Sequence, residues 1–320
     1  MNFLKSKLFK RSRRVLILPV NTGGSIIFLQ EALKLLNFDA EILTFSKHPF
    51  GYKKNKIIFK KNTNFMNIEI KKVLALRFYF YSKYIIFNYG RTIFTIESSE
   101  DKKNFLLLRR VQNIYYLMMQ KIEIFINKLL NNKIIIIYTG DDARQSNYCL
   151  NNYDISPAHS LSGTSYYSDK KNKIKKFNIR NMDKIADSIY AHNPDIMNVL
   201  PKRTIFLPYP YRYISKAKKE YPFEKINILH VPSHRGVKGT EIIINQINNL
   251  KKNKPDLEIN FTILENINNL KLLKILDSFD LVIDQVLVGW YGSIAVESMA
   301  RGIPVMAYIR ERDLHFILSQ

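Results

Sequence analysis

The fold is decided by residues 226–308, which begin INILHVPSHRGVKGTEIIINQI and end FDLVIDQVLVGWYGSIAVESMARGIPVMAY. Each half of this stretch predicts an apolar strand, then a short loop, then an amphipathic helix. In the second half, Gly302-Ile303-Pro304 follows the helix, as is typical of a helix C-terminus, and another apolar strand comes next. Parallel strands joined by helices make an α/β domain, and such domains bind ligands at the carboxyl ends of their strands.

The loop after the first strand carries cations. Arg235 and Lys238 precede Gly239-Thr240, where the helix is predicted to begin with Thr240 as its N-cap. Two cations beside free backbone N–H groups are suited to a phosphate, and Ser233 adds a hydroxyl. A solvated basic turn is the alternative, because short basic motifs are weak evidence on their own.

The loop after the later strand, residues 284–292, adds a second set of groups. Gly292 has no side chain, so an anion can approach the backbone of Gly292, Ser293 and Ile294 at the predicted helix start. Glu297 lies about one and a half turns into that helix. Its carboxylate could accept both hydroxyls of a ribose, and a partly exposed helical glutamate, which is common, is the alternative.

These loops resemble the donor-binding domain of GT-B glycosyltransferases, specifically the large retaining group of glycosyltransferase family 4. HVPSHRGVKGT is similar to that family's donor loop, and GWYGSIAVESMARGIPV is similar to its Glu-x7-Glu element followed by Met-Ala-x-Gly-x-Pro-Val. The resemblance implies that Arg235 and Lys238 hold the diphosphate of a nucleotide sugar and act in catalysis. It implies that the backbone of residues 292–294 faces this diphosphate, and that Glu297 binds the ribose.

The sequence departs from the family at the first glutamate of that element, which falls on Gly289. In the family this glutamate lies near the transferred sugar, so its role here is missing or belongs to another group. Asp284 and Tyr291 are the nearest candidates, and the sequence does not choose between them.

The amino-terminal half predicts a second α/β unit. A buried strand over residues 14–20 leads into a loop with Gly23 and Gly24, then into a helix through residue 36. This start resembles the family's first strand-to-helix turn, where two glycines let acceptor and donor approach the backbone. A plain tight turn is equally consistent. The spacing does not fit Gly-x-Gly-x-x-Gly, which argues against a dinucleotide fingerprint.

Two further candidates follow strands of this half. A strand over residues 134–138 runs into a loop in which Gly140, Asp142 and Arg144 match the family's cleft-facing Gly-x-Asp-x-Arg element. Asp142 is expected to orient Arg144 or accept a sugar hydroxyl, with a purely structural pair as the alternative. His192 follows a predicted strand and could touch the transferred sugar, or be a satisfied structural histidine.

The segment between these motifs is less regular. Residues 71–83 predict a basic, aromatic helix that could place Phe78, Tyr79 and Tyr81 at the headgroups of a membrane. An ordinary surface helix is the alternative. Strands are predicted over residues 85–88 and 93–96, a longer helix over residues 111–130, and a helix beginning at residues 183–187.

The net charge of +23 has three competing explanations. Compositional bias accounts for much of the lysine, because isoleucine and asparagine are also abundant. Anionic lipid headgroups would attract such a surface. Nucleic acid is the least favoured partner, since the sequence has no zinc-ligand cluster or RNA-binding motif.

The single cysteine, Cys149, excludes an intramolecular disulfide and fits a cytoplasmic protein. No apolar run reaches the length of a membrane span, and no signal peptide is evident.

Together these features predict an α/β protein of the GT-B class, with two Rossmann-like lobes and a cleft between them. We expect an acceptor domain over residues 1–210, a linker over 211–225 and a donor domain over 226–320 that is incomplete compared with the family. The predicted activity is transfer of a sugar from a nucleotide-diphosphate sugar to a polysaccharide or lipid-linked acceptor, without cofactor or metal. Retention of configuration follows from the resemblance alone. The location is cytoplasmic, at the inner face of the membrane. A non-catalytic GT-B protein that binds a nucleotide sugar or a partner, and a nucleotide-sugar epimerase, are the alternatives.

Overall fold

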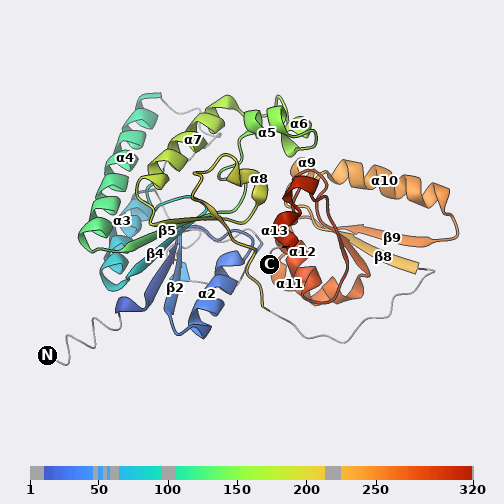
Figure 1. Cartoon of the computed structure of the whole chain (residues 1–320), viewed down its shortest axis with the longest axis horizontal. Helices are drawn as coiled ribbons and strands as arrows, with labels where there is room; N and C mark the ends of the chain where they lie inside the picture. The colour runs from blue at the N-terminus through green and yellow to red at the C-terminus, as the bar shows by residue number, and fades with distance from the viewer. Residues whose placement is uncertain are drawn as a thin grey trace.

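The chain forms two α/β lobes, each built on one parallel sheet (Figure 1). The computed structural model describes residues 11–45, 50–52, 56–57, 65–95, 106–212 and 225–318. Every strand pair in both sheets is parallel, so helices must cross over between strands and cover the sheet faces. The predicted two-lobe α/β architecture is confirmed.

The N-terminal lobe has a seven-stranded sheet in the order β3-β2-β1-β4-β5-β6-β7. Its inner strands are almost wholly apolar because helices cover both faces. Alternate residues of each strand enter two separate cores, so Leu16 and Leu18 pack on one face while Val15 and Ile17 pack on the other. The strands are β1 (Arg14–Leu18), β2 (Asp39–Thr44), β3 (Lys56–Ile57), β4 (Tyr84–Asn88), β5 (Lys133–Tyr138), β6 (Ser188–Ala191) and β7 (Ile205–Phe206).

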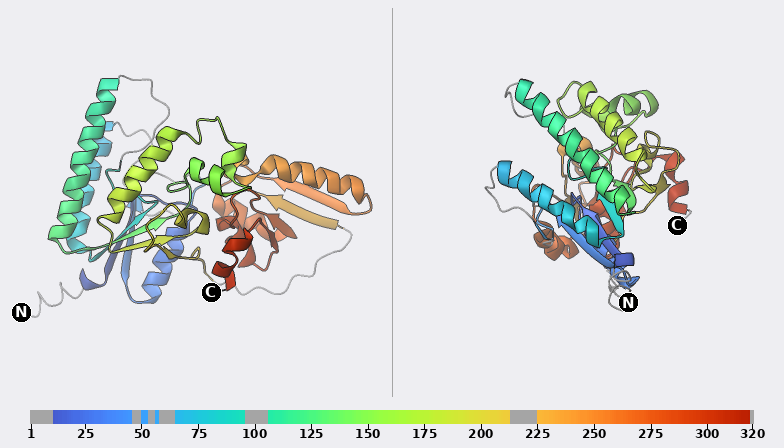
Figure 2. Two further views of the ribbon diagram at one scale, coloured as in Figure 1. Left: turned by 45° about the horizontal axis from the view of Figure 1, so that its top comes forward. Right: turned by 90° about the vertical axis from the view of Figure 1, so that its left-hand side faces the viewer.

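The helices of this lobe differ greatly in length. The 24-residue α4 and the 15-residue α7 run along one side of the lobe, and α3 lies beside α4 (Figure 2). The lobe contains α2 (Ser25–Leu35), α3 (Phe65–Ala75), the 3-10 helix η1 (Leu76–Tyr81), α4 (Leu106–Leu129), α5 (Ser146–Asn152), α6 (Pro157–Ser160), α7 (Asp169–Asp183) and α8 (Pro194–Met197).

The C-terminal lobe has a four-stranded sheet in the order β11-β10-β8-β9. Its strands are β8 (Lys225–His230), β9 (Glu258–Ile263), β10 (Leu281–Ile283) and β11 (Val305–Met306). The three strands that the sequence predicts within residues 226–308 are present as β8, β10 and β11. Its helices are α9 (Arg235–Lys238), α10 (Thr240–Asn253), α11 (Asn269–Ile275), η2 (Leu276–Ser278), α12 (Ser293–Met299), η3 (Glu311–Asp313) and α13 (His315–Leu318).

Apolar contacts join the two lobes. Leu161 and Tyr167 of the N-terminal lobe share one buried cluster with Val237 and Val288 of the C-terminal lobe. The ring of Phe316 in α13 lies 4.7 Å from that of Phe206 in β7, so the C-terminal helix contacts the first lobe. The predicted linker, residues 211–225, lies almost entirely outside the described residues.

Several local predictions are wrong. Residues 93–95 form a turn and no strand, because the backbone N–H groups of Ile93 and Phe94 bind the buried carboxylate of Glu123. Residue 96 lies outside the described residues. Thr240 is not an N-cap: Gly239, with φ of 76°, holds that position, and the Thr240 hydroxyl instead contacts Nε2 of His230 at 2.8 Å.

Two helix predictions also need correction. No helix begins at residues 183–187, because α7 ends at Asp183 and the chain turns into β6. Residues 71–83 are α-helical only to Ala75 and then continue as a 3-10 helix. Within it Tyr79 is fully buried, so it cannot lie at membrane headgroups, whereas Tyr81 is exposed. Among the described residues, no helix is both long and apolar enough to cross a bilayer.

Candidate functional site

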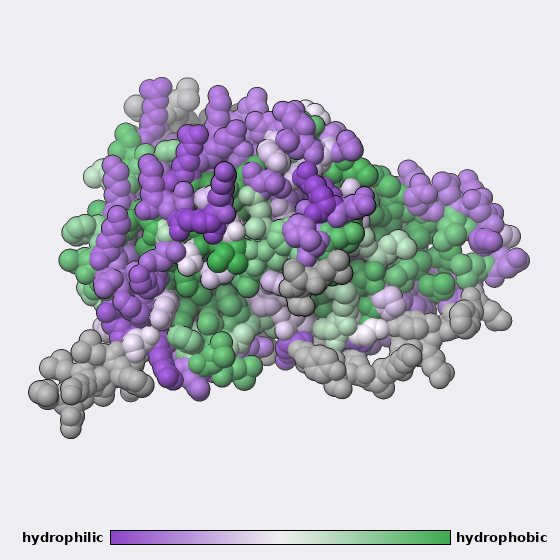
Figure 3. All heavy atoms as spheres, in the orientation of Figure 1, coloured by the Kyte–Doolittle hydropathy of each residue, from purple (hydrophilic) through white to green (hydrophobic). Residues whose placement is uncertain are grey.

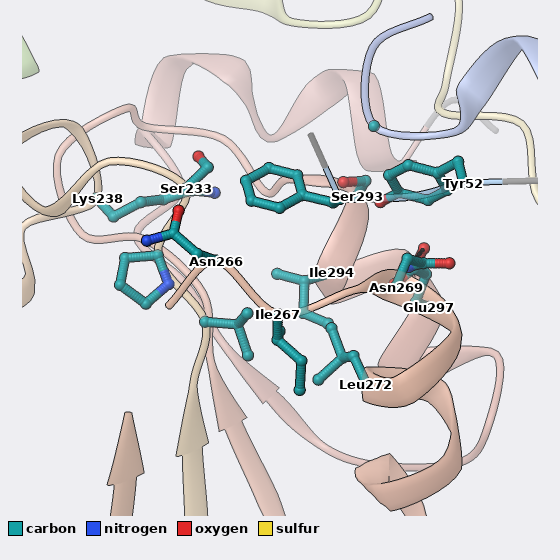
Figure 4. Close-up of a pocket in the computed structure, with 14 residues that line it drawn as sticks. Tyr52, Ser233, Lys238, Asn266, Ile267, Asn269, Leu272, Ser293, Ile294 and Glu297 are labelled. Atoms are coloured by element: carbon teal, nitrogen blue, oxygen red, sulfur yellow. Dashed lines mark hydrogen bonds between the residues drawn. The ribbon is translucent and has the colours of Figure 1, made fainter. Parts of the chain in front are cut away.

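A cavity of about 180 Å³ lies between the two lobes (Figure 4). It is bounded by the loops after β1 and β2 on one side, and on the other by the loops after β8 and β9 together with the start of α12. These are the carboxyl ends of parallel strands, where α/β domains bind ligands. The lining residues are Gly23, Phe50, Tyr52, Val231, Pro232, Ser233, Lys238, Asn266, Ile267, Asn269, Leu272, Ser293, Ile294 and Glu297.

Lys238 brings a fixed positive charge to this cavity. Its ammonium lies 2.8 Å from Oδ1 of Asp284 and 2.6 Å from Oε1 of Gln285. Asp284 directly follows β10 and is buried, and its other oxygen accepts the backbone N–H of Gly292. Asp284 and Gln285, which follow β10, therefore hold the Lys238 ammonium at the start of α12. Both carboxylate oxygens of Asp284 therefore have partners within the protein, Lys238 for one and the backbone of Gly292 for the other.

Glu297 faces the same cavity from α12. The carboxylate is buried, and Nδ2 of Asn269 lies 3.0 and 3.2 Å from its two oxygens. Burial raises the pKa of Glu297 to about 7, although the hydrogen bond from Asn269 opposes this shift. A carboxylate that ionises near neutral pH, with lone pairs left beyond those used by one amide, can accept hydroxyl groups from a ligand.

Tyr52 closes the cavity from the N-terminal lobe, opposite Glu297 (Figure 4). Its hydroxyl is hydrogen-bonded to Ser293, and its pKa is raised by burial and then by the charge of Glu297. A Cβ at Gly24 would lie 2.6 Å from the Tyr52 ring, and Gly24 has φ of 74°. The glycine at this position is therefore required both by backbone conformation and by the approach of the tyrosine.

The backbone beside Tyr52 also contacts the C-terminal lobe. The carbonyl of Phe50 accepts the N–H of Asn269 at 2.7 Å, and a Cβ at Gly51 would meet the side chain of Asn268. The N-terminal lobe thus contacts the residue that holds the Glu297 carboxylate.

The structure gathers half of the predicted site residues in the cavity: Gly23, Ser233, Lys238, Ser293, Ile294 and Glu297. Gly24 and Gly292 lie next to lining residues, because a Cβ at Gly24 would be 2.6 Å from Tyr52 and one at Gly292 would be 2.9 Å from the ammonium of Lys238. Arg235 does not line the cavity. Its guanidinium is directed to Glu241 and Glu265, at 2.6 and 2.8 Å, on the exposed surface of the lobe.

Asp142 and Arg144 do not form the expected pair. The Arg144 guanidinium is buried and contacts Asp195 and Asp141, each at 2.6 Å. The Asp142 carboxylate instead accepts the backbone N–H groups of Thr139 and Gly140. Burial raises the pKa of Asp142 to about 6, against these hydrogen bonds. The loop after β5 is therefore fixed by two separate sets of contacts.

His192 lies apart from the cavity lining. It is buried, its Nδ1 is 2.8 Å from the carbonyl oxygen of Leu207, and its ring stacks on Tyr209 at 4.7 Å. Burial lowers the pKa of His192 to about 4, so the imidazole stays neutral and its Nδ1–H donates to this carbonyl. Tyr209 in turn lies 6.3 Å from Tyr291, which stacks on Trp290 and also does not line the cavity.

Gly289 leaves no room for the family's first glutamate. Its φ is 79°, and a Cβ there would lie 2.3 Å from the guanidinium of Arg310. Arg310 is buried and lies 3.9 Å from the centre of the Tyr153 ring. A large cation from the C-terminal segment therefore occupies the space beside this loop.

Comparisons with known proteins found solved glycosyltransferase structures to which the chain is distantly similar. A scan against protein-family models and a search of curated proteins found no match. A solved glycotransferase of kitacinnamycin covers 94% of this chain and 81% of its own, at 9% identity and a TM-score of 0.39. Anabaena HepE, crystallised with UDP and glucose, covers 92% and 80%, at 10% identity and a TM-score of 0.45. S. aureus TarM, crystallised with UDP and saccharide ligands, covers 77% and 47%, at 13% identity and a TM-score of 0.42. Each identity is below 25% and each TM-score is below 0.5, so these similarities carry no argument about the activity or the substrates of this chain.

Proposed function

We propose that this chain is a glycosyltransferase that moves a sugar from a nucleotide-diphosphate sugar to a polysaccharide or lipid-linked acceptor. The observation that supports it is that a cation, Lys238, and a buried acid, Glu297, line the same cavity between two lobes, each built on a parallel sheet. The family resemblance of the two loops adds retention of configuration. We also propose that the protein works in the cytoplasm, at the inner face of the membrane, and needs no metal.

Lys238 would bind the diphosphate and stabilise the charge that develops on it as the sugar leaves. An ammonium has three N–H donors, and two of them reach Asp284 and Gln285. The third can donate to a phosphate oxygen in the cavity. Because Asp284 and Gln285 hold the ammonium in place before the reaction, little reorganisation is needed when charge builds up.

Glu297 would hold the ribose. Its two oxygens accept from the amide of Asn269 and retain lone pairs for the two ribose hydroxyls. Tyr52 and Ile294, on either side of the same cavity, supply apolar surface for the nucleoside.

A thermal-shift panel tests the donor site. We expect one of the UDP-, GDP-, ADP-, CMP- or dTDP-sugars to raise the melting temperature of the wild-type protein, since a ligand bound only by the native state stabilises it. The shift should be reduced in Glu297→Gln and kept in Glu258→Gln, a matched change of an exposed glutamate in the same lobe. A folded wild-type protein that responds to no donor would contradict the proposal.

The pH dependence of donor binding isolates Glu297. Its folded pKa is about 7, so the fraction ionised rises through neutral pH, and only the ionised form accepts both ribose hydroxyls fully. We therefore expect the Kd of the identified nucleotide sugar, measured by calorimetry, to fall as pH rises from about 6 to about 8. A nucleotide sugar is used because its diphosphate does not titrate there. Glu297→Gln should make the Kd independent of pH; a pH dependence that persists in this variant would assign it to another group.

The raised pKa of Glu297 has the opposite effect on the stability of the free protein. A carboxyl whose pKa is higher in the folded than in the unfolded state destabilises the fold once it is ionised, so this contribution to stability is lost as pH rises through about 7. Donor binding and stability should therefore respond to pH in opposite directions.

A non-catalytic donor-binding protein is the second candidate, and the Arg310 side chain packed on Gly289 favours it. Turnover separates the candidates once a donor is known. Hydrolysis or transfer supports the transferase, and saturable binding without turnover supports the binding protein. Conversion of the free nucleotide sugar to its epimer would instead indicate an isomerase.

A further inference from the structure

The outer face of α3, η1 and α4 carries an uncovered apolar stripe. Exposed apolar residues recur along α4 at intervals of three and four, from Val111 to Leu129, so they follow one side of the helix over about 27 Å. Two of the largest, Met118 and Phe125, have 60% and 64% of their surface exposed. The α4 members of the stripe are Val111, Ile114, Met118, Ile122, Phe125 and Leu129.

The neighbouring helix extends this stripe. Lys72 and Glu69 of α3 both contact the hydroxyl of Tyr116 in α4, which fixes the two helices side by side. Figure 2 shows them next to each other on the end of the lobe that faces the viewer in its right-hand panel. Figure 3 shows apolar side chains in green among purple ones along the edge that α4 occupies. The exposed apolar residues of α3 and η1 are Met66, Ile70, Val73, Leu74, Phe80 and Tyr81.

The charge on this face has one sign. The three elements contain two acidic residues, Glu69 and Glu123, and both are buried. Glu69 pairs with Lys72, while Glu123 accepts from the Tyr79 hydroxyl and from the turn at residues 93–94. The exposed charges of the same elements are all cationic, namely Arg77, Arg110, Lys121 and Lys128.

We propose that this α3–η1–α4 face docks on an anionic lipid bilayer. A helix with an apolar stripe and flanking cations lies in the plane of a membrane interface, with the stripe among the acyl chains and the cations at the headgroups. A second copy of the chain fits less well, because it would bring a second cationic surface against the first. A nucleic acid would match the cations and leave the apolar stripe without a partner.

The face lies at the end of the N-terminal lobe that is remote from the C-terminal lobe (Figure 1). Membrane docking is therefore independent of the donor cavity, and each can fail without the other.

Vesicle flotation tests the inference on the full chain. We expect the protein to float with vesicles of phosphatidylcholine and phosphatidylglycerol in equal parts, and to stay behind with phosphatidylcholine alone. Binding should weaken as salt is raised, because salt screens the cations. Two paired changes on α4 probe the two components: Met118→Ser with Phe125→Ser for the stripe, and Lys121→Gln with Lys128→Gln for the charge. Each pair should lower the partition coefficient by roughly tenfold or more.

Matched changes on α10 are the controls. Ile242→Ser with Leu250→Ser, and Lys251→Gln with Lys252→Gln, alter exposed residues of the same kinds in the other lobe, and should leave binding unchanged. All four double variants change exposed side chains only, so each should melt at the wild-type temperature. If the α10 variants lose as much vesicle binding as the α4 variants, the binding reflects a general attraction of the net charge, and the inference is overturned. Absence of vesicle binding would overturn it too, as would a wild-type dimer that the stripe change converts to a monomer.

Discussion

Lys238→Met should lower kcat for sugar transfer by roughly 100- to 1,000-fold, the usual cost of removing one preorganised donor from a developing negative charge. The same substitution should also destabilise the protein. Asp284 is completely buried and would be left without its cation, and breaking such a pair by removing one member costs about 3–5 kcal/mol. A loss of activity in this variant alone would therefore not distinguish chemistry from misfolding.

A second change separates the two effects. In Lys238→Met with Asp284→Asn the buried charge is gone, and the asparagine oxygen can still accept the N–H of Gly292. We expect the free energy of unfolding, measured by urea titration, to recover most of the loss, while kcat stays low. Recovery of activity along with stability would show that Lys238 serves only to neutralise Asp284, and would remove it from the proposed mechanism.

The sequence was sufficient to predict strands β8, β10 and β11 of the C-terminal lobe and the placement of Lys238 and Glu297 beyond their carboxyl ends. Lys238 and Glu297 each follow an apolar strand, β8 and β10, a short way along the chain. The α/β pattern therefore places both residues at the carboxyl edge of the sheet, where the cavity lies. The predicted strands of this lobe were confirmed for the same reason, because long apolar runs between turn residues are strong signals.

The partners of these residues could not be predicted, because they depend on tertiary packing. Asn269 reaches Glu297 only because α11 begins beside α12, and Tyr52 reaches the cavity from the other lobe. Asp284 was recognised as a nearby acid, yet nothing local shows that it pairs with a lysine 46 residues away. One sequence signal does bear on Asn269: residues 266–269 follow the carboxyl end of β9, so they belong to the same edge of the sheet.

The error at Asp142 has the same origin. The Gly-x-Asp-x-Arg spacing suggests a local pair, but a carboxylate after a strand readily accepts nearby backbone N–H groups, as Asp142 does. Arg144 instead pairs with Asp195, which is 51 residues away in the first turn of α8. Spacing alone cannot choose between a local and a remote carboxylate.

The remote pair of Arg144 and Asp195 leads to a second prediction about stability. Arg144→Met should lower the free energy of unfolding by about 3–5 kcal/mol, because it leaves the buried Asp195 carboxylate uncompensated. Asp141 loses its arginine as well, although Lys175 and the Tyr166 hydroxyl remain near it. The matched control is Arg235→Met, whose guanidinium also bridges two acids but lies on the surface, where water and salt screen the charges. That variant should unfold at nearly the wild-type urea concentration.

Removing the Asp195 charge as well tests whether that unpaired charge causes the loss of stability in Arg144→Met. If burial of an unpaired charge is responsible, Arg144→Met with Asp195→Asn should be more stable than Arg144→Met alone, since the remaining group at that position is uncharged. If both variants unfold alike, the loss comes from packing of the guanidinium and not from its charge. Because Arg144 and Asp195 join the loop after β5 to α8, we expect the single variant to lose order first in that loop, which hydrogen exchange of residues 139–144 would report.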